Sequence, residues 1–469
     1  MGDGASERLA RGWLLLSVFS LVFAGIFALM VAMARTPGVQ SLLPLGRDYI
    51  YVALVGHVVL AVVIWFLAFE GFLWAHASTA LIGRRVWSAP LGYLSLLCSA
   101  AGVSLAVVSA LFALGPAVLA NYLPVLNSPV FYAGLALFAF GICGNLFNTA
   151  LTVIKAVRAG VSLPPAAFGI CASGAAVAVA FLCFALSGWF QYSAGLVYID
   201  FERLFWGGGH ILQFANTIAM AAVWLYLSAL LFKRGQQGVL WAKLLFLAYF
   251  LFILPSPLIY FVRDISEQSR KESFTWLMQW GLGPITAVFA VMVLRGIAAQ
   301  GGRLWKDPGF SSLVLSIAVF VTGALIAVNI SGANTIIPAH YHCSIGAVTI
   351  AFMGLFYKLA PLPGRRVYSP RLANVQPWLY SIGVVMFALG LFLAGAHGAA
   401  RKTYGAEQNL DTIGRLAGMS IMGAGSLLAI AGGAAFVWNA LATLLSAGRA
   451  EAQERRAEPD GATEKRGQC

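Results

Sequence analysis

The chain contains little charge and little histidine. Charged residues make up 10% of its 469 residues and only 17 are acidic, whereas soluble domains carry roughly 25% charge. Hydrophobic residues reach 60% and the mean hydropathy is +0.84. This balance excludes an ordinary soluble enzyme and predicts an integral membrane protein.

Cysteine motifs are also missing. The six cysteines show no CxxC or CxxCH spacing, so neither a zinc site nor a covalently attached c-type haem is indicated. Cysteines inside apolar runs, such as Cys98 and Cys183, fit the role of small buried hydrophobic residues.

Long apolar runs are abundant. Backbone groups in hydrocarbon must be hydrogen-bonded internally, so runs of about 20 apolar residues predict membrane helices. Twelve are expected, near 12–34, 49–76, 90–114, 128–155, 166–190, 204–232, 240–262, 273–299, 310–330, 336–361, 376–397 and 413–447. The predicted architecture is an all-α bundle of twelve transmembrane helices over residues 1–447. A charged and disordered cytoplasmic tail is expected at 448–469.

The basic residues predict an orientation. If both termini face the cytoplasm, most of the 30 Lys and Arg residues fall in inner segments, as the positive-inside rule requires. We therefore expect a multi-pass protein of the cell inner membrane with both termini in the cytoplasm. Basic loops beside an anionic lipid leaflet also explain the net charge of +13, so no nucleic-acid partner is expected.

Four of the six histidines fall at one predicted depth. At 1.5 Å per helical residue, His57 lies about 12 Å below the outer start of its span, His210 about 9 Å, and His340 and His342 about 6 to 9 Å. Histidine inside a membrane span is costly without a partner, so a shared layer indicates ligands. The alternative for each histidine alone is a buried residue hydrogen-bonded to a neighbouring helix.

The His340-Tyr341-His342 motif can serve two sites. Two residues of helix rotate a side chain by about 200°, so the two imidazoles point to opposite faces. Neutral imidazole is a good ligand for iron or copper. His57 with one member of the pair satisfies a bis-histidine haem, and the other member satisfies a five-coordinate haem with an open face.

With these features the chain resembles subunit I of the haem-copper oxidases, a superfamily that includes the nitric oxide reductases. The resemblance spans about residues 10–445. It is carried by GHVVLAVVIWFLAFEGFLW in span two, RLFWGGGHILQFANT in span six and AHYHCSIGAVTIAFMGL in span ten. The resemblance implies two haems: a low-spin haem held by His57 and His342, and a high-spin haem held by His340. It makes His210 a ligand of a second metal.

The resemblance also implies partners and a basic site. Arg401 and Lys402 match a basic pair that binds haem propionates, and arginine can bind a carboxylate through two hydrogen bonds. An outer-side electron donor such as cytochrome c, an additional membrane subunit and the lipid bilayer are the expected partners.

One part of the pattern is missing. The family takes two further copper ligands from adjacent histidines in span seven, where this chain reads LFLAYFLFILPSPLIYFVRD. A single imidazole binds copper weakly, so we expect the copper site to be absent or rebuilt. Tyr260 lies where the missing pair would fall and joins His340 and His210 as a candidate catalytic residue. Gln213 and Asn216 share much of the His210 helix face.

Several functions remain open at this point. The leading hypothesis is a respiratory oxidase-like oxidoreductase that passes electrons from the low-spin to the high-spin haem and reduces oxygen. The alternatives are a nitric oxide reductase-like enzyme and a copper-less dihaem protein for electron transfer or gas sensing. A twelve-span transporter is disfavoured because transporters bind substrates near the bilayer midplane, not in the outer layer where these histidines lie.

Overall fold

A computed structural model describes residues 4–42, 45–232, 239–264, 268–299, 304–360 and 366–446. Within these ranges twelve helical segments are long and apolar enough to span a membrane. This confirms the predicted all-α membrane architecture and the positions of the twelve spans. The tail predicted at 448–469 lies outside the described residues.

Two of the spans are interrupted. Span two consists of α2 (Arg47–Val58), a π-helical segment η2 (Val59–Ile64) and α3 (Trp65–Thr79). Span seven consists of α8 (Val239–Ile253), the 3-10 turn η3 (Ser256–Leu258) and the short α9 (Ile259–Val262). Pro255 and Pro257 lie at this break. Proline removes a backbone donor and disrupts a helix, which explains the interruption.

The other ten spans are single helices. They are α1 (Gly4–Arg35), α4 (Ala89–Leu111), α5 (Pro129–Arg158), α6 (Pro165–Ser193), α7 (Phe201–Leu231), α10 (Gln268–Ala298), α11 (Pro308–Ala327), α12 (Ile336–Leu359), α13 (Pro370–Ala396) and α14 (Ile413–Leu445). Short elements lie in the connections: η1 (Gln40–Leu42), η4 (Gly405–Gln408), and an antiparallel pair β1 (Ala117–Val118) and β2 (Val125–Leu126).

Several helices begin at side chains that satisfy free backbone N–H groups. Ser88 accepts from the Leu91 N–H at α4, and Asp200 accepts from the Arg203 N–H at α7. Asp307 caps α11 by accepting from two backbone N–H groups. Such caps stabilise the starts of these helices, because the N–H groups of the first turn have no partners within the helix.

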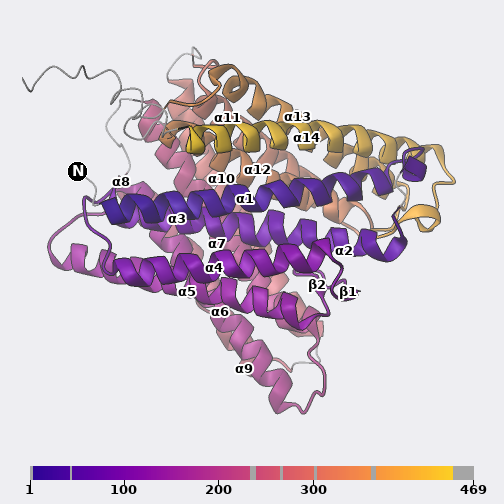
Figure 1. The fold of residues 1–469 in the computed structure, drawn as a ribbon, viewed down its shortest axis with the longest axis horizontal. Coiled ribbons are helices and arrows are strands. Elements are labelled where there is room, and N and C mark those ends of the chain that lie inside the picture. The colour runs from indigo at the N-terminus through magenta and orange to yellow at the C-terminus, as the bar shows by residue number, and fades with distance from the viewer. Residues whose placement is uncertain are drawn as a thin grey trace, which may run out of the picture.

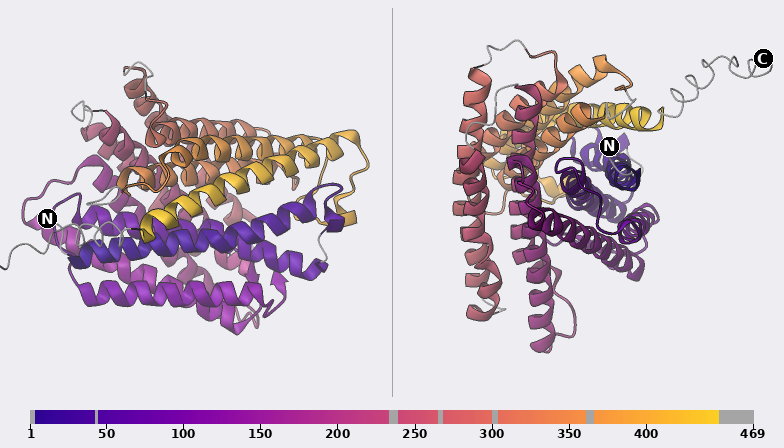
Figure 2. Two further views of the ribbon diagram at one scale, coloured as in Figure 1. Left: turned by 45° about the horizontal axis from the view of Figure 1, so that its top comes forward. Right: turned by 90° about the vertical axis from the view of Figure 1, so that its left-hand side faces the viewer.

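The chain folds back on itself, so its first and last helices are neighbours. Helix α1 packs against α3 and α14, and α14 packs along α13 (Figure 1). The helices are not all parallel. In the right-hand view of Figure 2, α1 is seen nearly end-on while α10 is seen from the side.

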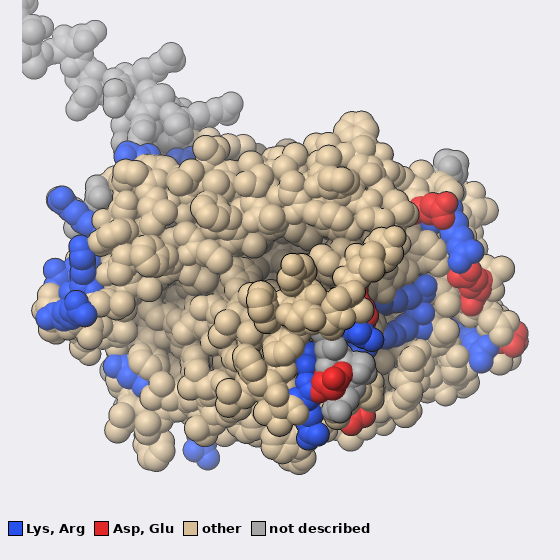
Figure 3. All heavy atoms as spheres, turned by 90° about the horizontal axis from the view of Figure 1, so that it is seen from below, with Lys and Arg blue, Asp and Glu red and all other residues tan. Residues whose placement is uncertain are grey.

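Charge divides the molecule into two ends and an apolar middle. Lys and Arg gather at the end where the N-terminus lies, while acidic and basic residues mix at the opposite end (Figures 1 and 3). Between them the face in Figure 3 is mostly uncharged, as expected of a surface that contacts lipid.

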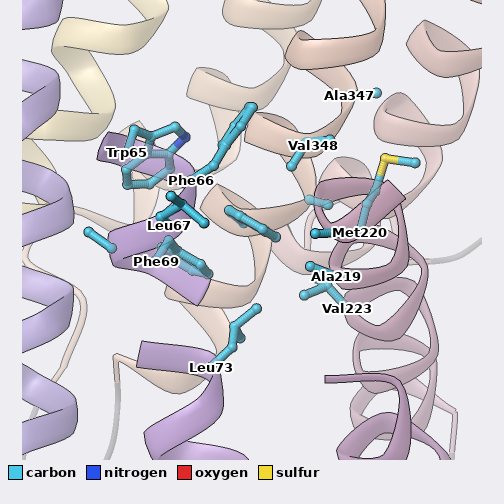
Figure 4. Packing of buried hydrophobic residues seen from close by; sticks show 14 of the residues in the cluster. Trp65, Phe66, Leu67, Phe69, Leu73, Ala219, Met220, Val223, Ala347 and Val348 are labelled. Atoms are coloured by element: carbon cyan, nitrogen blue, oxygen red, sulfur yellow. The ribbon is translucent and has the colours of Figure 1, made fainter. Parts of the chain in front are cut away.

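An aromatic core joins the three spans that carry the histidine layer. Trp65, Phe66 and Phe69 of α3 face residues of α7 and α12, including Met220 (Figure 4). Phe69 stacks on Phe352 of α12 with ring centroids 4.4 Å apart. Close packing of large buried rings allows little relative movement, so this core fixes the helices on which the ligand candidates are mounted.

Candidate haem site

A single large cavity joins the predicted histidine layer. Its volume is ≈ 2030 Å³, and His57, His210, His340 and His342 all line it. Pockets for one small ligand measure roughly 300–1,000 Å³, so this cavity has room for more than one large group. The structure therefore brings together four histidines from three spans, as the shared depth predicted.

Each of the four imidazoles is oriented by a backbone carbonyl. The Nδ1–O distances are 3.2 Å from His57 to Ala24, 2.7 Å from His210 to Trp206, 2.8 Å from His340 to Gly323, and 2.7 Å from His342 to Pro338. A carbonyl only accepts, so Nδ1 carries the hydrogen and donates it. In the neutral ring Nε2 then keeps its lone pair, which is the arrangement a histidine needs to ligate a metal.

The two histidines of the span-ten motif point to different neighbours. His340 donates to Gly323 of α11, whereas the His342 ring packs on Phe387 of α13 with centroids 4.4 Å apart. The two side chains therefore project toward different neighbouring helices, α11 and α13. His57 and His342 line the same cavity, as a bis-histidine site requires.

Glycine permits the close approach that orients His340. A Cβ atom at Gly323 would lie 2.9 Å from the Cys343 Cβ and 3.2 Å from the His340 carbonyl oxygen. Any larger residue would therefore separate α11 from α12. The hydrogen bond from His340 to the Gly323 carbonyl depends on that contact.

The π-helical segment is a feature that the sequence did not reveal. It begins two residues after His57, and Val59, Leu60 and Ile64 within it are buried. A π turn inserts extra backbone into a helix, which rotates the preceding helical segment relative to the next one, and such turns are frequent at functional sites. Here it separates the segment that presents His57 from α3, which packs in the aromatic core.

Three consecutive glycines precede His210 and serve packing. A Cβ at Gly207 would meet the Tyr260 hydroxyl at 2.2 Å, and one at Gly209 would meet the Tyr122 ring at 2.5 Å. Glycine inside a helix destabilises it by about 1 kcal/mol relative to alanine, and the close contacts explain why it is present. The Tyr122 ring consequently lies 4.6 Å from the His210 ring, centroid to centroid.

His210 is surrounded by neutral polar groups. Its Nε2 lies 3.3 Å from the Thr275 hydroxyl of α10, and the Tyr122 hydroxyl is hydrogen-bonded to Gln213. Burial raises the pKa of Tyr122 in its loop well above the ordinary value, with the Gln213 bond opposing the rise, so this hydroxyl stays protonated. Thr275 and Tyr122 were not identified from the sequence, because neither residue type is distinctive in a helix or loop.

The predicted basic pair lies at the cavity, in the connection between α13 and α14. Arg401 donates to the Asn121 side-chain oxygen at 2.6 Å, and Lys402 donates to the same oxygen at 3.2 Å. Lys402 has a φ of 59°, a left-handed conformation that lysine rarely adopts, so its position is enforced by its surroundings. Burial lowers the pKa of the Lys402 ammonium, and the neighbouring Arg401 charge acts in the same direction.

A carboxylate neutralises only part of this basic group. Glu202 accepts from the Asn121 backbone N–H at 2.7 Å and lies 3.6 Å from the Lys271 ammonium. One acid therefore stands among three cations: Lys271, Arg401 and Lys402. The surplus positive charge at this end of the cavity suits an anionic group.

Arg35 is a further cavity residue that the sequence analysis missed. It ends α1 and lines the cavity, and its Nε and Nη2 atoms are buried without a hydrogen-bond partner among the described residues. A buried guanidinium without a partner is strongly unfavourable, so its N–H groups require an acceptor. An arginine at the end of a span is usually interpreted as an anchor at the membrane interface, so the sequence did not mark Arg35 as a cavity residue.

Tyr260, a catalytic candidate from the sequence, is not among the residues that line the cavity. It packs behind α7, where its ring lies 5.4 Å from Phe274 and 5.2 Å from the Arg270 guanidinium. We therefore leave Tyr260 out of the proposed site.

The remaining histidines lie away from the cavity lining. His76 is buried 2.9 Å from the Tyr226 hydroxyl, and His397 is held by the Leu393 carbonyl at 2.9 Å. Among the described residues no group of three or more His, Cys, Asp or Glu side chains is arranged to hold a metal ion. His210 thus stands without the further imidazoles that a copper site of the family requires.

The residues fit haem better than they fit a second metal. The Nε2 atoms of His57, His340 and His342 are available to ligate iron, and the cavity is mostly apolar in its lining. The unpartnered Arg35 N–H groups and the basic pair match the carboxylates that haem carries. Asn216 and Gln213, both at the cavity, are poor ligands for copper.

Comparisons with known proteins identify the family of the chain. Residues 8–428 match the family described as cytochrome c and quinol oxidase polypeptide I. The chain is 31% identical over 383 residues to an uncharacterised protein of Aquifex aeolicus, covering 80% of this chain and 90% of that protein. It is 27% identical over 237 residues to cytochrome c oxidase subunit 1 of Thermus thermophilus, covering 44% of this chain and 41% of that protein.

The fold is also similar to a solved structure. A heme-copper terminal oxidase dimer determined by cryo-EM contains a chain that superposes with a TM-score of 0.77 at 19% identity, covering 94% of this chain and 84% of that chain. The matched family extends through eleven of the twelve spans and into the last, and the histidines of spans two, six and ten all lie within it. The chain therefore belongs to the cytochrome c and quinol oxidase polypeptide I family of multi-pass membrane oxidoreductases.

Proposed function

We propose that the protein is a haem-binding membrane oxidoreductase that takes electrons from an outer-side donor such as cytochrome c and reduces a small molecule, oxygen first. One observation carries the proposal. Four imidazoles from three helices line one cavity, and each has its Nδ1 held by a carbonyl, which leaves the Nε2 lone pairs of His57, His340 and His342 available to a metal.

Three of these histidines are assigned to haem. His57 and His342 would hold a low-spin haem from two sides, and His340 would hold a high-spin haem from one side. Bound there, haem supplies one-electron transfer and, on an open face, a position for a small ligand. His210 faces the cavity from α7 and is assigned to the ligand side of the high-spin position.

The protein's own groups prepare these positions. The carbonyls of Ala24, Gly323 and Pro338 fix the rings and make their Nε2 atoms more basic. Arg35, Arg401 and Lys402 provide positive charge where propionates would lie. The Phe387 ring on His342 and the aromatic core around Phe66 keep water from the axial ligands.

The proposed orientation rests on charge. The end rich in Lys and Arg would face the cytoplasm, with both termini on that side and the basic pair on the outer side of the cell inner membrane. A donor such as cytochrome c then approaches the end at which Arg401 and Lys402 lie. An additional membrane subunit would cover part of the exposed apolar surface.

A second candidate has its own support. The described residues contain no cluster of metal-ligating side chains around His210. This favours a copper-less dihaem protein that binds a gas or relays electrons without reducing oxygen.

Metal analysis combined with a reduced-minus-oxidised spectrum of the purified protein tests the proposal. Two haems per chain, one low-spin and one high-spin, are expected. Oxygen consumption with a reduced cytochrome c supports the oxidoreductase, whereas two haems without oxygen consumption support the second candidate. A folded protein that binds no haem contradicts both.

A further inference from the structure

The polar groups around His210 form a site of their own, outside the haem ligands. His210 is 1% exposed, and its Nδ1 bond to the Trp206 carbonyl leaves Nε2 directed at the Thr275 hydroxyl. Thr275 also donates to the Lys271 carbonyl at 3.0 Å. Its single hydrogen can point to either acceptor, so this hydroxyl can be redirected when a ligand is present.

Helix α10 contributes a second polar residue on the same face. Gln279 follows Thr275 by four residues, which places the two side chains one above the other, and both line the cavity. Asn216 of α7, the helix that carries His210, also lines the cavity, and its side-chain oxygen is buried without a hydrogen-bond partner among the described residues. The groups facing this part of the cavity are therefore an imidazole, a hydroxyl and amides.

These groups are chemically different from a metal site. Copper and iron bind imidazole, thiolate and carboxylate well, whereas neutral hydroxyl and amide groups are weak ligands for them. The hydroxyl and amide N–H groups are good hydrogen-bond donors, and in a water-poor cavity such bonds are stronger than in water. The His210 Nε2 only accepts, because the ring carries its hydrogen on Nδ1, and it positions the Thr275 hydroxyl. Neutral donors in the cavity that His340 also lines suit a small ligand whose outer atom accepts hydrogen bonds.

We propose that the Thr275 hydroxyl, positioned by His210, and the Gln279 amide form a hydrogen-bonding site that replaces the second metal and donates to the outer atom of a diatomic ligand on the His340 haem. This inference rests on the proposed function, because it requires haem at His340. It assigns α10 a direct part in ligand binding. Tyr122 supports the site by packing on His210 and bonding to Gln213.

Infrared spectroscopy of the reduced protein with carbon monoxide tests this site without relying on turnover. A donor near the ligand oxygen draws electron density onto it and weakens the C–O bond. Thr275→Val and Gln279→Leu remove donors with little change in shape, so each is expected to shift the C–O stretch to higher wavenumber. Thr275→Ser keeps the hydroxyl and should return the band toward its original position.

Thr322→Val is the matched control, because Thr322 lies on α11 outside the cavity lining and bonds only to the Ala318 carbonyl of its own helix. An unchanged band in this variant, with shifted bands in Thr275→Val and Gln279→Leu, supports the proposal. Identical bands in all variants overturn it while leaving the haem assignment intact. Stoichiometric copper in the purified protein also overturns it, and the absence of haem overturns both this site and the proposed function.

Discussion

The two sides of α12 differ in how completely they keep the pattern of their family. On the α13 side, the His342 ring packs on Phe387, and we propose that His342 and His57 provide both axial positions of a low-spin haem. On the α11 side, His340 is oriented by the Gly323 carbonyl, and His210, which lines the same cavity, has a neutral hydroxyl at its Nε2. Under the proposed function, the electron-accepting side is complete and the ligand-binding side has been changed.

The largest expected effect comes from removing a ligand on the complete side. His342→Ala should abolish the low-spin haem signal in the reduced-minus-oxidised spectrum and spare the high-spin signal, because each imidazole serves one haem. His397→Ala is the control, since His397 is exposed and lies outside the cavity lining. Equal loss of both signals in a folded His342→Ala protein would contradict the division into two sides.

Gly323→Ala tests what orients the His340 ring on the α11 side. The new methyl group would meet the Cys343 Cβ at 2.9 Å, so α11 and α12 must separate and the bond from His340 Nδ1 to the residue-323 carbonyl must lengthen. Overpacking of this kind destabilises a core by about 1–3 kcal/mol. Resonance Raman spectroscopy should show a weaker iron–histidine stretch while the low-spin spectrum is kept.

Gly296→Ala provides the reference for that experiment. No atom lies within 4 Å of a Cβ at position 296, so alanine should stabilise α10 by up to about 1 kcal/mol and leave both haem signals unchanged. If Gly323→Ala behaves like Gly296→Ala, the close contact between α11 and α12 is not what orients His340.

Arg35→Gln is expected to act on the complete side with a moderate effect. Removing a cation stabilises the oxidised haem, so the midpoint potential should fall, by about 60 mV for each 1.4 kcal/mol of lost interaction. The haem-free protein should become more stable, because an unpartnered buried charge is removed. Arg84→Gln, at an exposed turn outside the cavity lining, should change neither quantity. A potential that does not move would show that Arg35 has no anionic partner at the haem.

The histidine layer could be predicted from sequence because helical rise converts residue number into depth, and His57, His210 and His340 are each counted from a clear span boundary. Depth does not specify direction around the helix. The π turn after His57 leaves no composition signal. Counting along span seven likewise did not show that Tyr260, which follows the break at Pro255 and Pro257, is absent from the cavity lining. The contact of Thr275 with His210 could be found only from the structure, in which α10 packs against α7.

Lys402 gives the smallest expected effect and a test with pH. Because burial lowers the pKa of this ammonium, it loses its charge at a lower pH than an ordinary lysine. In the interval between the lowered pKa and the usual lysine pKa, the unfolded chain binds more protons than the folded chain. The contribution of Lys402 to the stability of the haem-free protein should therefore rise with pH over this interval. Lys402→Arg keeps the charge and should remove this dependence. Unfolding measured against pH checks it, and the same pH profile in both haem-free proteins would mean that burial does not lower the pKa of Lys402.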